Sequence, residues 1–272
     1  MIRAITRVMG VVNRTPDSFS STEILPSLDE SVSLALRHLA QGAELLDIGG
    51  ESTRPGATPV SAAEELDRVI PLIRALRPQT RAIISIDTMK PAVARAACDA
   101  GADMWNDVTA LTWAEDSLAT AAELGCQVVL MHMQGRPRTM QAEPTYNDPV
   151  AEVGEFLVAR AQAAEAAGVA RSQIWLDPGI GFGKSLNHNL ALLAGLDRLT
   201  ALGHPVLLGV SRKRFVQAVD LTANDPADRL GGSLAAALAG ARAGVAAVRA
   251  HDVRQTVQAL TVDAAIRQAQ PR

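Results

Sequence analysis

The chain has little of what marks membrane, secreted or nucleic-acid-binding proteins. Its only cysteines, Cys98 and Cys126, form no Cys-x-x-Cys pair, and their apolar surroundings indicate buried thiols in a reducing compartment. The net charge of −3 provides no field that would attract nucleic acid or an anionic membrane surface. The longest stretch of small and apolar residues, 230–241, is too short to span a bilayer. These absences predict a cytoplasmic protein with small-molecule partners and no nucleic-acid or membrane partner.

Lysine is also scarce. The chain has only Lys90, Lys184 and Lys213, each just after a predicted strand, and all its other fixed positive charge is arginine. A compact ammonium reaches a single ring atom, whereas a planar guanidinium suits bidentate anions. We interpret Lys90 as a residue that opens a helix without a functional role, and Lys213 as a functional cation.

Hydrophobic residues make up 48% of the 272 positions, enough for a large core in one domain. Short apolar runs recur along the chain, with segments of helical spacing between them. The runs span residues 8–12, 43–48, 82–86, 102–105, 127–131, 174–176, 206–210 and 246–248. Runs that are apolar almost throughout predict the strands of a parallel sheet covered on both faces.

Eight β-then-α units in 272 residues predict an α/β fold, a closed (β/α)8 TIM barrel with a single domain over residues 1–272. Ser61 with Glu64 predicts a helix N-cap, and Asp29 is a second cap candidate. Glycines at the expected helix ends are typical of C-caps. They are Gly42, Gly101, Gly125, Gly168, Gly203 and Gly244.

Polar residues stand at nearly every predicted strand end, where active sites of such barrels lie. They are Asn13, Asp47, Asp87, Asn106, Asp107, His132, Asp177, Ser211, Arg212, Lys213, Arg249 and His251. A full ring of such residues exceeds what helix capping requires, and it predicts an active site at the carboxyl ends of the strands. We interpret His132 as a residue that orders its loop rather than as a catalytic one.

The stretch 176–184 is the clearest ligand loop. A strand delivers Asp177 to its carboxyl end, and Pro178 with three glycines then lets the backbone approach a ligand. The stretch is not a Walker A loop, because Pro178 stands where that motif requires glycine. Phe182, between two glycines, fits a flat aromatic substrate.

Strand ends from the middle of the chain supply acceptors. Asp87, Asn106 and Asp177 together suit a heterocycle rich in N–H donors, such as a pterin or a purine-like ring. Whether Asp87 and Asp177 lie close enough for paired acid–base work stays open at this point. A serine hydrolase is disfavoured, because no Gly-x-Ser-x-Gly elbow is present.

The last two strand ends supply cations. Lys213, Arg249 and His251 follow strands 7 and 8, whose loops often bind phosphate in these barrels, and they predict an anion pocket. Asn13, from the adjacent first loop, would position a metal-bound phosphate through its amide oxygen, since Mg²⁺ takes oxygen ligands and keeps several waters.

Several of these residues fall in longer stretches that occur in a fixed order. The stretches are 9–20 (MGVVNRTPDSFS), 47–56 (DIGGESTRPG), 85–88 (SIDT), 106–108 (NDV), 130–135 (LMHMQG), 177–184 (DPGIGFGK), 211–213 (SRK) and 249–252 (RAHD). They closely resemble the signature stretches of the dihydropteroate synthase family, from about residue 7 to the last helix.

The resemblance implies a transferase of folate biosynthesis, which joins 6-hydroxymethyl-7,8-dihydropterin diphosphate to para-aminobenzoate and releases diphosphate. It implies catalytic roles for Asp87, Asp177, Lys213, Arg249 and His251. The pterin would be held by Asp87, Asn106, Asp177 and Lys213, with Arg249 stacking on it. The diphosphate and Mg²⁺ would be held by Arg249, His251 and Asn13. Para-aminobenzoate would be surrounded by Thr53, Arg54, Pro55, Phe182, Ser211 and Lys213. The family also implies a homodimer and a sulfonamide target.

Two other functions stay open beside this one. The pterin-binding domain of methyltetrahydrofolate-dependent methyltransferases has a similar barrel but expels no diphosphate, so the anion pocket argues against it. A non-catalytic pterin-binding paralogue is conceivable because the first loop departs from the family. Residues 21–26 (STEILP) replace the usual Asp-Gly-Gly stretch, and Arg14 adds positive charge beside Asn13. We hypothesise altered loop closure, para-aminobenzoate affinity and sulfonamide sensitivity.

Overall fold

The chain folds into an eight-stranded parallel barrel. The structure, a computed structural model, describes residues 6–15, 25–52, 58–135, 140 and 144–269. The strands are β1 (Arg7–Asn13), β2 (Leu45–Gly49), β3 (Ile83–Asp87), β4 (Met104–Asp107), β5 (Gln127–Met131), β6 (Ile174–Asp177), β7 (Leu207–Gly209) and β8 (Ala247–Ala250). They pair in the order β6-β5-β4-β3-β2-β1-β8-β7, and a parallel bridge between Leu176 and Val206 joins the two edges. The predicted (β/α)8 barrel is confirmed.

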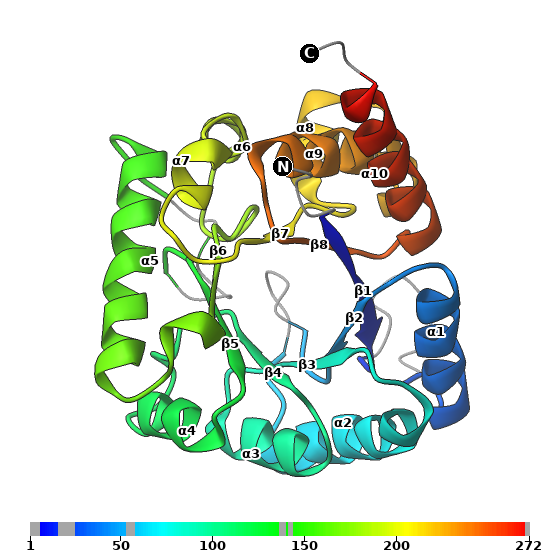
Figure 1. Cartoon of the computed structure of the whole chain (residues 1–272), viewed down its shortest axis with the longest axis vertical. Coiled ribbons are helices and arrows are strands. Elements are labelled where there is room, and N and C mark those ends of the chain that lie inside the picture. The colour runs from blue at the N-terminus through cyan, green and yellow to red at the C-terminus, as the bar shows by residue number, and fades with distance from the viewer. Residues whose placement is uncertain (1–5, 16–24, 53–57, 136–139, 141–143, 270–272) are drawn as a thin grey trace.

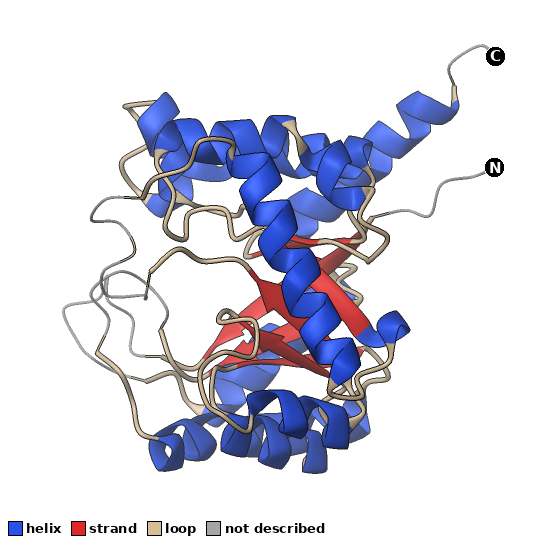
Figure 2. Ribbon diagram, turned by 90° about the vertical axis from the view of Figure 1, so that its left-hand side faces the viewer, coloured by secondary structure: helices blue, strands red, loops and turns tan. Residues whose placement is uncertain are grey.

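Helices surround the strands as an outer ring (Figure 1). They are α1 (Leu28–Ala40), α2 (Ala62–Leu76), α3 (Pro91–Asp99), α4 (Ser117–Leu124), α5 (Pro149–Ala166), α6 (Leu186–Ala194), α7 (Leu196–Thr200), α8 (Arg214–Val219), α9 (Leu230–Ala243) and α10 (Val253–Gln268), with 3-10 turns η1 (Arg77–Gln79), η2 (Arg171–Gln173) and η3 (Pro226–Arg229). In the side view of Figure 2, α5 crosses in front of the strands. None of the helices in the described part of the chain is long and apolar enough to cross a membrane.

The predicted helix ends are largely correct. All six glycines expected at C-caps have a left-handed φ between 60° and 110°, which glycine adopts without strain. Ser61 caps α2, and its hydroxyl accepts a hydrogen bond from the Glu64 N–H at 3.1 Å. Asp29 is not a cap, because Ser27 occupies that position with Glu30 in a full capping box.

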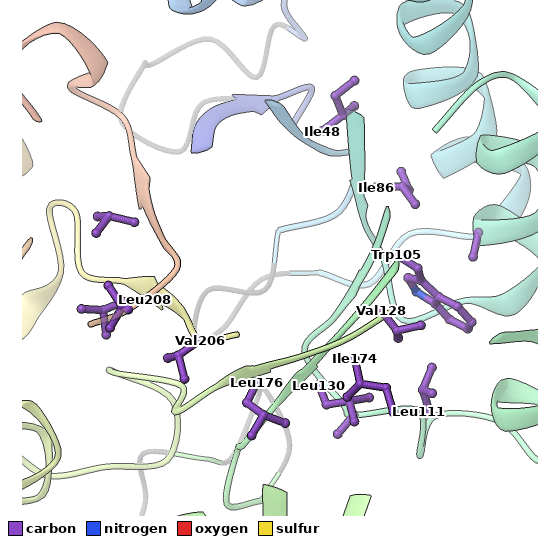
Figure 3. Packing of buried hydrophobic residues seen from close by; sticks show 14 of the residues in the cluster. Ile48, Ile86, Trp105, Leu111, Val128, Leu130, Ile174, Leu176, Val206 and Leu208 are labelled. Atoms are coloured by element: carbon purple, nitrogen blue, oxygen red, sulfur yellow. The ribbon is translucent and has the colours of Figure 1, made fainter. Parts of the chain in front are cut away.

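The outward faces of the strands pack against the helices in the largest apolar cluster, part of which is seen in Figure 3. Trp105 on β4 is among the largest fully buried side chains, and its indole N–H donates to the Thr88 carbonyl at 2.7 Å. Cys98 and Cys126 are free thiols, as expected, but each is only partly buried. Burial of this face supplies most of the stabilisation that the barrel needs.

Inside the barrel, each strand contributes one residue to an apolar layer. The layer consists of Met9, Leu45, Ile83, Met104, Val129, Trp175, Leu207 and Ala247, with Ala246 packed beside it. Because successive side chains of a strand point to opposite faces, residues two positions further on point inward again, nearer the carboxyl ends. Five of those eight positions are polar, namely Asp47, Ser85, Asn106, Asp177 and Arg249, and the other three are Val11, Met131 and Gly209. A polar layer therefore stands on a closed apolar floor.

The Trp105 contact gives a stability prediction. Trp105→Phe leaves the buried Thr88 carbonyl without its donor and opens space in the core, so we expect the free energy of unfolding to fall by about 2 kcal/mol or more. Trp113→Phe is the matched control, because Trp113 is 48% exposed; it should change stability by less than about 0.5 kcal/mol. Urea unfolding followed by circular dichroism measures both, and equal effects would contradict this account of the core.

Candidate active site

A buried carboxylate, Asp47 on β2, lies at the centre of the polar layer and is fully shielded from solvent. Its Oδ1 accepts a hydrogen bond from the Ser85 hydroxyl at 2.7 Å. The Asn106 amide nitrogen lies 3.4 Å from Oδ1 and 3.3 Å from Oδ2. Arg249 on β8 donates from Nε to Oδ2 at 2.6 Å. Three other strands thus converge on one acceptor.

Arg249 joins Asp47 to the predicted pterin residue Asp87. Its second contact runs from a terminal guanidinium nitrogen to Asp87 Oδ2 at 2.9 Å. Burial, reinforced by the nearby Asp47 charge, raises the pKa of Asp87 to about 7, against the lowering effect of Arg249. The sequence grouped Arg249 with an anion pocket; in this structure it lies among the carboxylates, because they hold the nearest compensating charge.

Asp177 ends β6 and begins the glycine loop. Its Oδ1 accepts from the Gly179 N–H at 2.7 Å, and its carbonyl accepts from the His132 N–H at 3.0 Å. Burial raises the pKa of Asp177, although the Lys213 charge counteracts this. Gly179 has a φ of 65°, and a Cβ there would lie 1.9 Å from the His132 carbonyl oxygen. Only glycine fits this turn, but the group that comes close to Gly179 is the His132 carbonyl; the predicted approach to a ligand stays a prediction.

Lys213 lies between the glycine loop and β7. Its Nζ donates to the Ile180 carbonyl and sits 4.7 Å from the centre of the Phe182 ring. Gly209, the last residue of β7, lies beside this Nζ and Asp177 Oδ2, because a Cβ there would be in ordinary contact with both atoms, at 3.5 and 4.0 Å. Burial lowers the pKa of Lys213 to about 8, and Asp177 offsets part of that effect.

The final strand end carries His251 beside Ser211. The His251 N–H donates to the Ser211 oxygen at 3.1 Å, and His251 Nδ1 lies 3.1 Å from the same oxygen. Arg212 follows Ser211 in the loop after β7. It has a left-handed φ of 58°, which costs about 1–2 kcal/mol for a non-glycine residue. Its guanidinium makes two contacts with Asp252, at 2.6 and 2.9 Å, and these hold the strained turn in place.

Asn13 stands at the rim, at the end of β1, with an exposed side chain. A Cβ on Gly49 would lie 3.1 Å from Asn13 Oδ1 and 3.8 Å from Asp87 Oδ2, so glycine keeps the space between them open. No group of three His, Cys, Asp or Glu side chains among the described residues could hold a metal. One amide oxygen fits an Mg²⁺ ion that keeps its waters and arrives with a phosphate, but not a permanent cage.

Two of the three lysines have contacts that the sequence did not reveal. Lys184 is 3% exposed and donates to the Phe182 carbonyl at 2.9 Å and the His132 carbonyl at 3.2 Å, with His132 Nδ1 at 3.0 Å. Burial and the adjacent ammonium lower the pKa of His132 to about 3, so the ring is neutral and accepts. This supports the interpretation of His132 as loop-ordering. Lys90 opens α3 at the N-cap position, as predicted, and it also forms ion pairs with two glutamates.

The remaining predicted site residues either lie away from the polar layer or belong to the residues that the structure does not describe. Thr53, Arg54, Pro55 and the altered first-loop positions 21–24 lie outside the described residues, and their predicted roles stay predictions. The guanidinium of Arg14, which was predicted to add charge beside Asn13, is buried and donates to the carbonyls of Arg68 at 2.7 Å and Pro26 at 3.1 Å. Asp107 serves its own loop by accepting from the Thr109 and Leu111 N–H groups.

Asp47 is the functional residue that the sequence reasoning failed to assign. It appeared in the ring of strand ends but received no role. The available signal was its position inside the apolar strand LLDIG, because an ionisable residue buried in a strand needs a charged partner. The alternation of side chains in β2 would have placed Asp47 on the same face as Gly49, pointing into the barrel near the carboxyl ends of the strands.

Comparison with known proteins identifies the family. Residues 9–251 match a family described as pterin binding enzyme. A dihydropteroate synthase from Escherichia coli strain K12 is 45% identical over 255 residues, covering 94% of this chain and 89% of the relative. The chain belongs to the dihydropteroate synthase family of pterin-binding enzymes.

Solved structures extend the family likeness to the whole barrel. A Yersinia pestis dihydropteroate synthase with a sulfonamide drug complex has a TM-score of 0.92 and 44% identity, covering 97% of this chain and 95% of that one. A Xanthomonas albilineans dihydropteroate synthase in complex with 7,8-dihydropteroate has a TM-score of 0.87 and 48% identity, covering 98% and 95%. The family resemblance read from the motifs is confirmed.

The glycine loop of this dihydropteroate synthase family member gives a second prediction. Gly179→Ala should lower the melting temperature markedly, because the methyl group would overlap the His132 carbonyl. Gly125→Ala is the matched control: Gly125 has a similar φ of 60° but has no atom within 4 Å of its Cβ position. The control should lose only the backbone cost of about 1–2 kcal/mol. Differential scanning calorimetry distinguishes the two, and equal losses would show that the contact with His132 is unimportant.

Proposed function

We propose that the chain is a dihydropteroate synthase, which condenses 6-hydroxymethyl-7,8-dihydropterin diphosphate with para-aminobenzoate to give 7,8-dihydropteroate and diphosphate. The carrying observation is one polar layer in which Asp47, Asp87 and Asn106 meet Arg249, with Asp177 and Lys213 beside it. Relatives of this family include one solved with 7,8-dihydropteroate.

The pterin would lie on the acceptor side of the pocket. Asp87, Asn106 and Asp177 offer carboxylate and amide groups to the ring N–H donors, and the apolar layer beneath them excludes water. Lys213, held at the Ile180 carbonyl, would donate to a single ring atom. The fixed negative groups would also stabilise the delocalised cation that forms when the pterin C–O bond ionises.

The departing diphosphate would bind at the last strand end. Arg249 is paired with Asp47 and Asp87 in the free structure, and the diphosphate would offer its guanidinium a further anionic partner. His251, oriented through Ser211, and Asn13 would complete this side. Mg²⁺, carried with the diphosphate, would supply further neutralisation of the leaving group.

Para-aminobenzoate would lie against Phe182 and Lys213, with Ser211, Thr53, Arg54 and Pro55 closing the wall. An arylamine is neutral at pH 7, so its attack on the pterin methylene requires positioning rather than a general base. The relative solved with a sulfonamide drug supports the further proposal that sulfonamides compete with para-aminobenzoate for this part of the site.

The decisive experiment mixes the chain with the pterin diphosphate, para-aminobenzoate and Mg²⁺, and follows dihydropteroate by chromatography together with diphosphate release. We expect both products in equal amounts and a loss of turnover when EDTA removes Mg²⁺. Lys213→Met should lower kcat/KM on the order of 100-fold, because a charge-stabilising donor is lost. Arg214→Met, which removes a neighbouring exposed cation, should stay within about 2-fold.

Pterin binding without diphosphate release would refute the synthase and favour a non-catalytic binding paralogue. Transfer of a methyl group from methyltetrahydrofolate would favour the methyltransferase domain instead.

We also propose a cytoplasmic homodimer that forms through α9 and α10. The groove between these helices is lined by Leu234, Leu238 and Ala259 and ends in Val262 and Ile266, which are 52% and 61% exposed. Adjacent exposed apolar side chains are typical of an interface, and a second copy could bury the same stripe symmetrically. The free thiols of Cys98 and Cys126 suit a reducing compartment.

The dimer proposal predicts a change in mass. Light scattering after size exclusion should give twice the chain mass of 28.6 kDa for the wild type and the single mass for a Val262→Glu, Ile266→Glu double variant. Leu221→Glu, at a position 79% exposed outside the groove, should remain dimeric. A wild type with the single mass would refute the proposal.

A further inference from the structure

The turn after β7 has a strained backbone immediately before Lys213. Arg212 is one of three non-glycine residues in the described part of the chain with a left-handed φ. Such a conformation persists only where surrounding contacts over-determine it, and it is frequent at functional sites. Lys213 itself has an extended backbone, with a φ of −74° and a ψ of 153°, and it is the N-cap residue of α8. The contacts of Arg212 and of α8 therefore decide where the Lys213 side chain leaves the backbone.

Both backbone groups of Arg212 are held by the start of α9. The Arg212 N–H donates to the Ser233 hydroxyl at 2.8 Å, and the Arg212 carbonyl accepts from a terminal guanidinium nitrogen of Arg229 at 3.1 Å. The Ser233 hydroxyl donates in turn to the Arg229 carbonyl at 2.7 Å. Together with the contacts of its side chain to Asp252, these bonds hold the left-handed residue at its N–H, its carbonyl and its guanidinium.

Arg229 also holds the chain on the other side of Lys213. Its second terminal nitrogen donates to the side-chain oxygen of Gln217 on α8 at 2.9 Å and to the Asn224 carbonyl at 2.8 Å. Its Nε donates to the Ala223 carbonyl at 3.1 Å. One guanidinium thus joins the residue before Lys213 to the helix that begins after it.

The packing of α8 on α9 leaves little room for movement. A Cβ on Gly232 in α9 would lie 2.4 Å from Val216 Cγ1 in α8, so glycine is required where the two helices approach. The Val216 N–H donates to the Lys213 carbonyl at 3.2 Å. The position of α8 on α9 is therefore passed on to the backbone of Lys213.

Stability alone does not explain a charged residue at position 229. Arg229 is 6% exposed, and the four oxygens to which its guanidinium donates are carbonyl or amide oxygens without a charge. Desolvation of an ion is costly, and buried charges are usually paired with an opposite charge for that reason. A planar group with five donors can, however, fix several segments in one geometry, which a neutral side chain cannot do.

The ammonium that this turn directs lies at the glycine loop. Lys213 Nζ donates to the Ile180 carbonyl and lies 4.7 Å from the centre of the Phe182 ring. The lysine stem is long and flexible, so the place of the ammonium depends on where the backbone starts it.

We propose that Arg229 and Ser233 are positioning residues for Lys213, which hold the turn after β7 so that the ammonium reaches the bound substrate. This inference rests on the proposed function, in which Lys213 donates to the pterin ring. Neither residue would touch the substrate. Both would act through the peptide groups of Arg212, and Arg229 would also act through α8.

Ser233→Ala tests this with the removal of a single hydroxyl. The Arg212 N–H loses its acceptor, and we expect kcat/KM for dihydropteroate formation to fall on the order of 10-fold. The same substitution made in a Lys213→Met background should change kcat/KM by less than about 2-fold, because the ammonium that it would misplace is absent. A purely structural defect would instead lower activity by the same factor in both backgrounds. Arg229→Lys keeps the charge without the planar fork, and it should also lose its effect once Lys213 is replaced.

Ser31→Ala is the matched control. Ser31 on α1 is as deeply buried as Ser233, and its hydroxyl likewise donates to the carbonyl four residues earlier, that of Ser27, at 2.9 Å. It should leave kcat/KM within about 2-fold of the wild type. With an active wild type, the inference is refuted if Ser233→Ala behaves like Ser31→Ala, or if its loss is equally large with and without Lys213. A wild type that forms no dihydropteroate would refute the proposed function itself.

Discussion

The candidate active site depends on the ion pair between Asp47 and Arg249. The two side chains come from strands on either side of β1; the Asp47 side chain is fully buried, and the Arg249 side chain is 21% exposed. An unpaired charge at this depth would be strongly destabilising, by about 3–5 kcal/mol when one partner of a buried pair is removed. Ser85, Asn106 and Asp87 complete the pairing, so the polar layer acts as one hydrogen-bonded unit and orients the groups around it.

Backbone geometry makes room for that unit. The apolar layer below it closes the barrel interior, and glycines above it remove side chains where the ligand groups need space. Gly49 opens the region between Asn13 and Asp87, since a Cβ there would lie 3.1 Å from Asn13 Oδ1. The same requirement explains the turn after Asp177, where Gly179 passes against the His132 carbonyl. The glycines therefore leave the space that the charged residues of the polar layer need.

The three lysines show how sparingly the chain uses compact cations. Lys213 donates to the Ile180 carbonyl of the glycine loop, Lys184 holds that loop to His132 at the end of β5, and Lys90 joins Glu51 to Glu65. Lys184 and Lys90 each contact several acceptors that converge from different directions, a geometry that a flat guanidinium fits less well. Arginine serves where two parallel contacts are needed, as in Arg212 with Asp252.

The sequence by itself determined the barrel, the carboxyl-end position of the site and the family, because apolar periodicity and linear motifs are local properties of the chain. Residues 127–131 were predicted as a strand with the bounds that β5 has. Tertiary structure alone decided which charges pair. Arg249 contacts Asp47 and Asp87 across 202 and 162 positions, and Lys90 turned out to bind Glu51 and Glu65 although its sequence context indicated only a helix start. Ion pairing depends on distances in space and on shared burial, which no local pattern records.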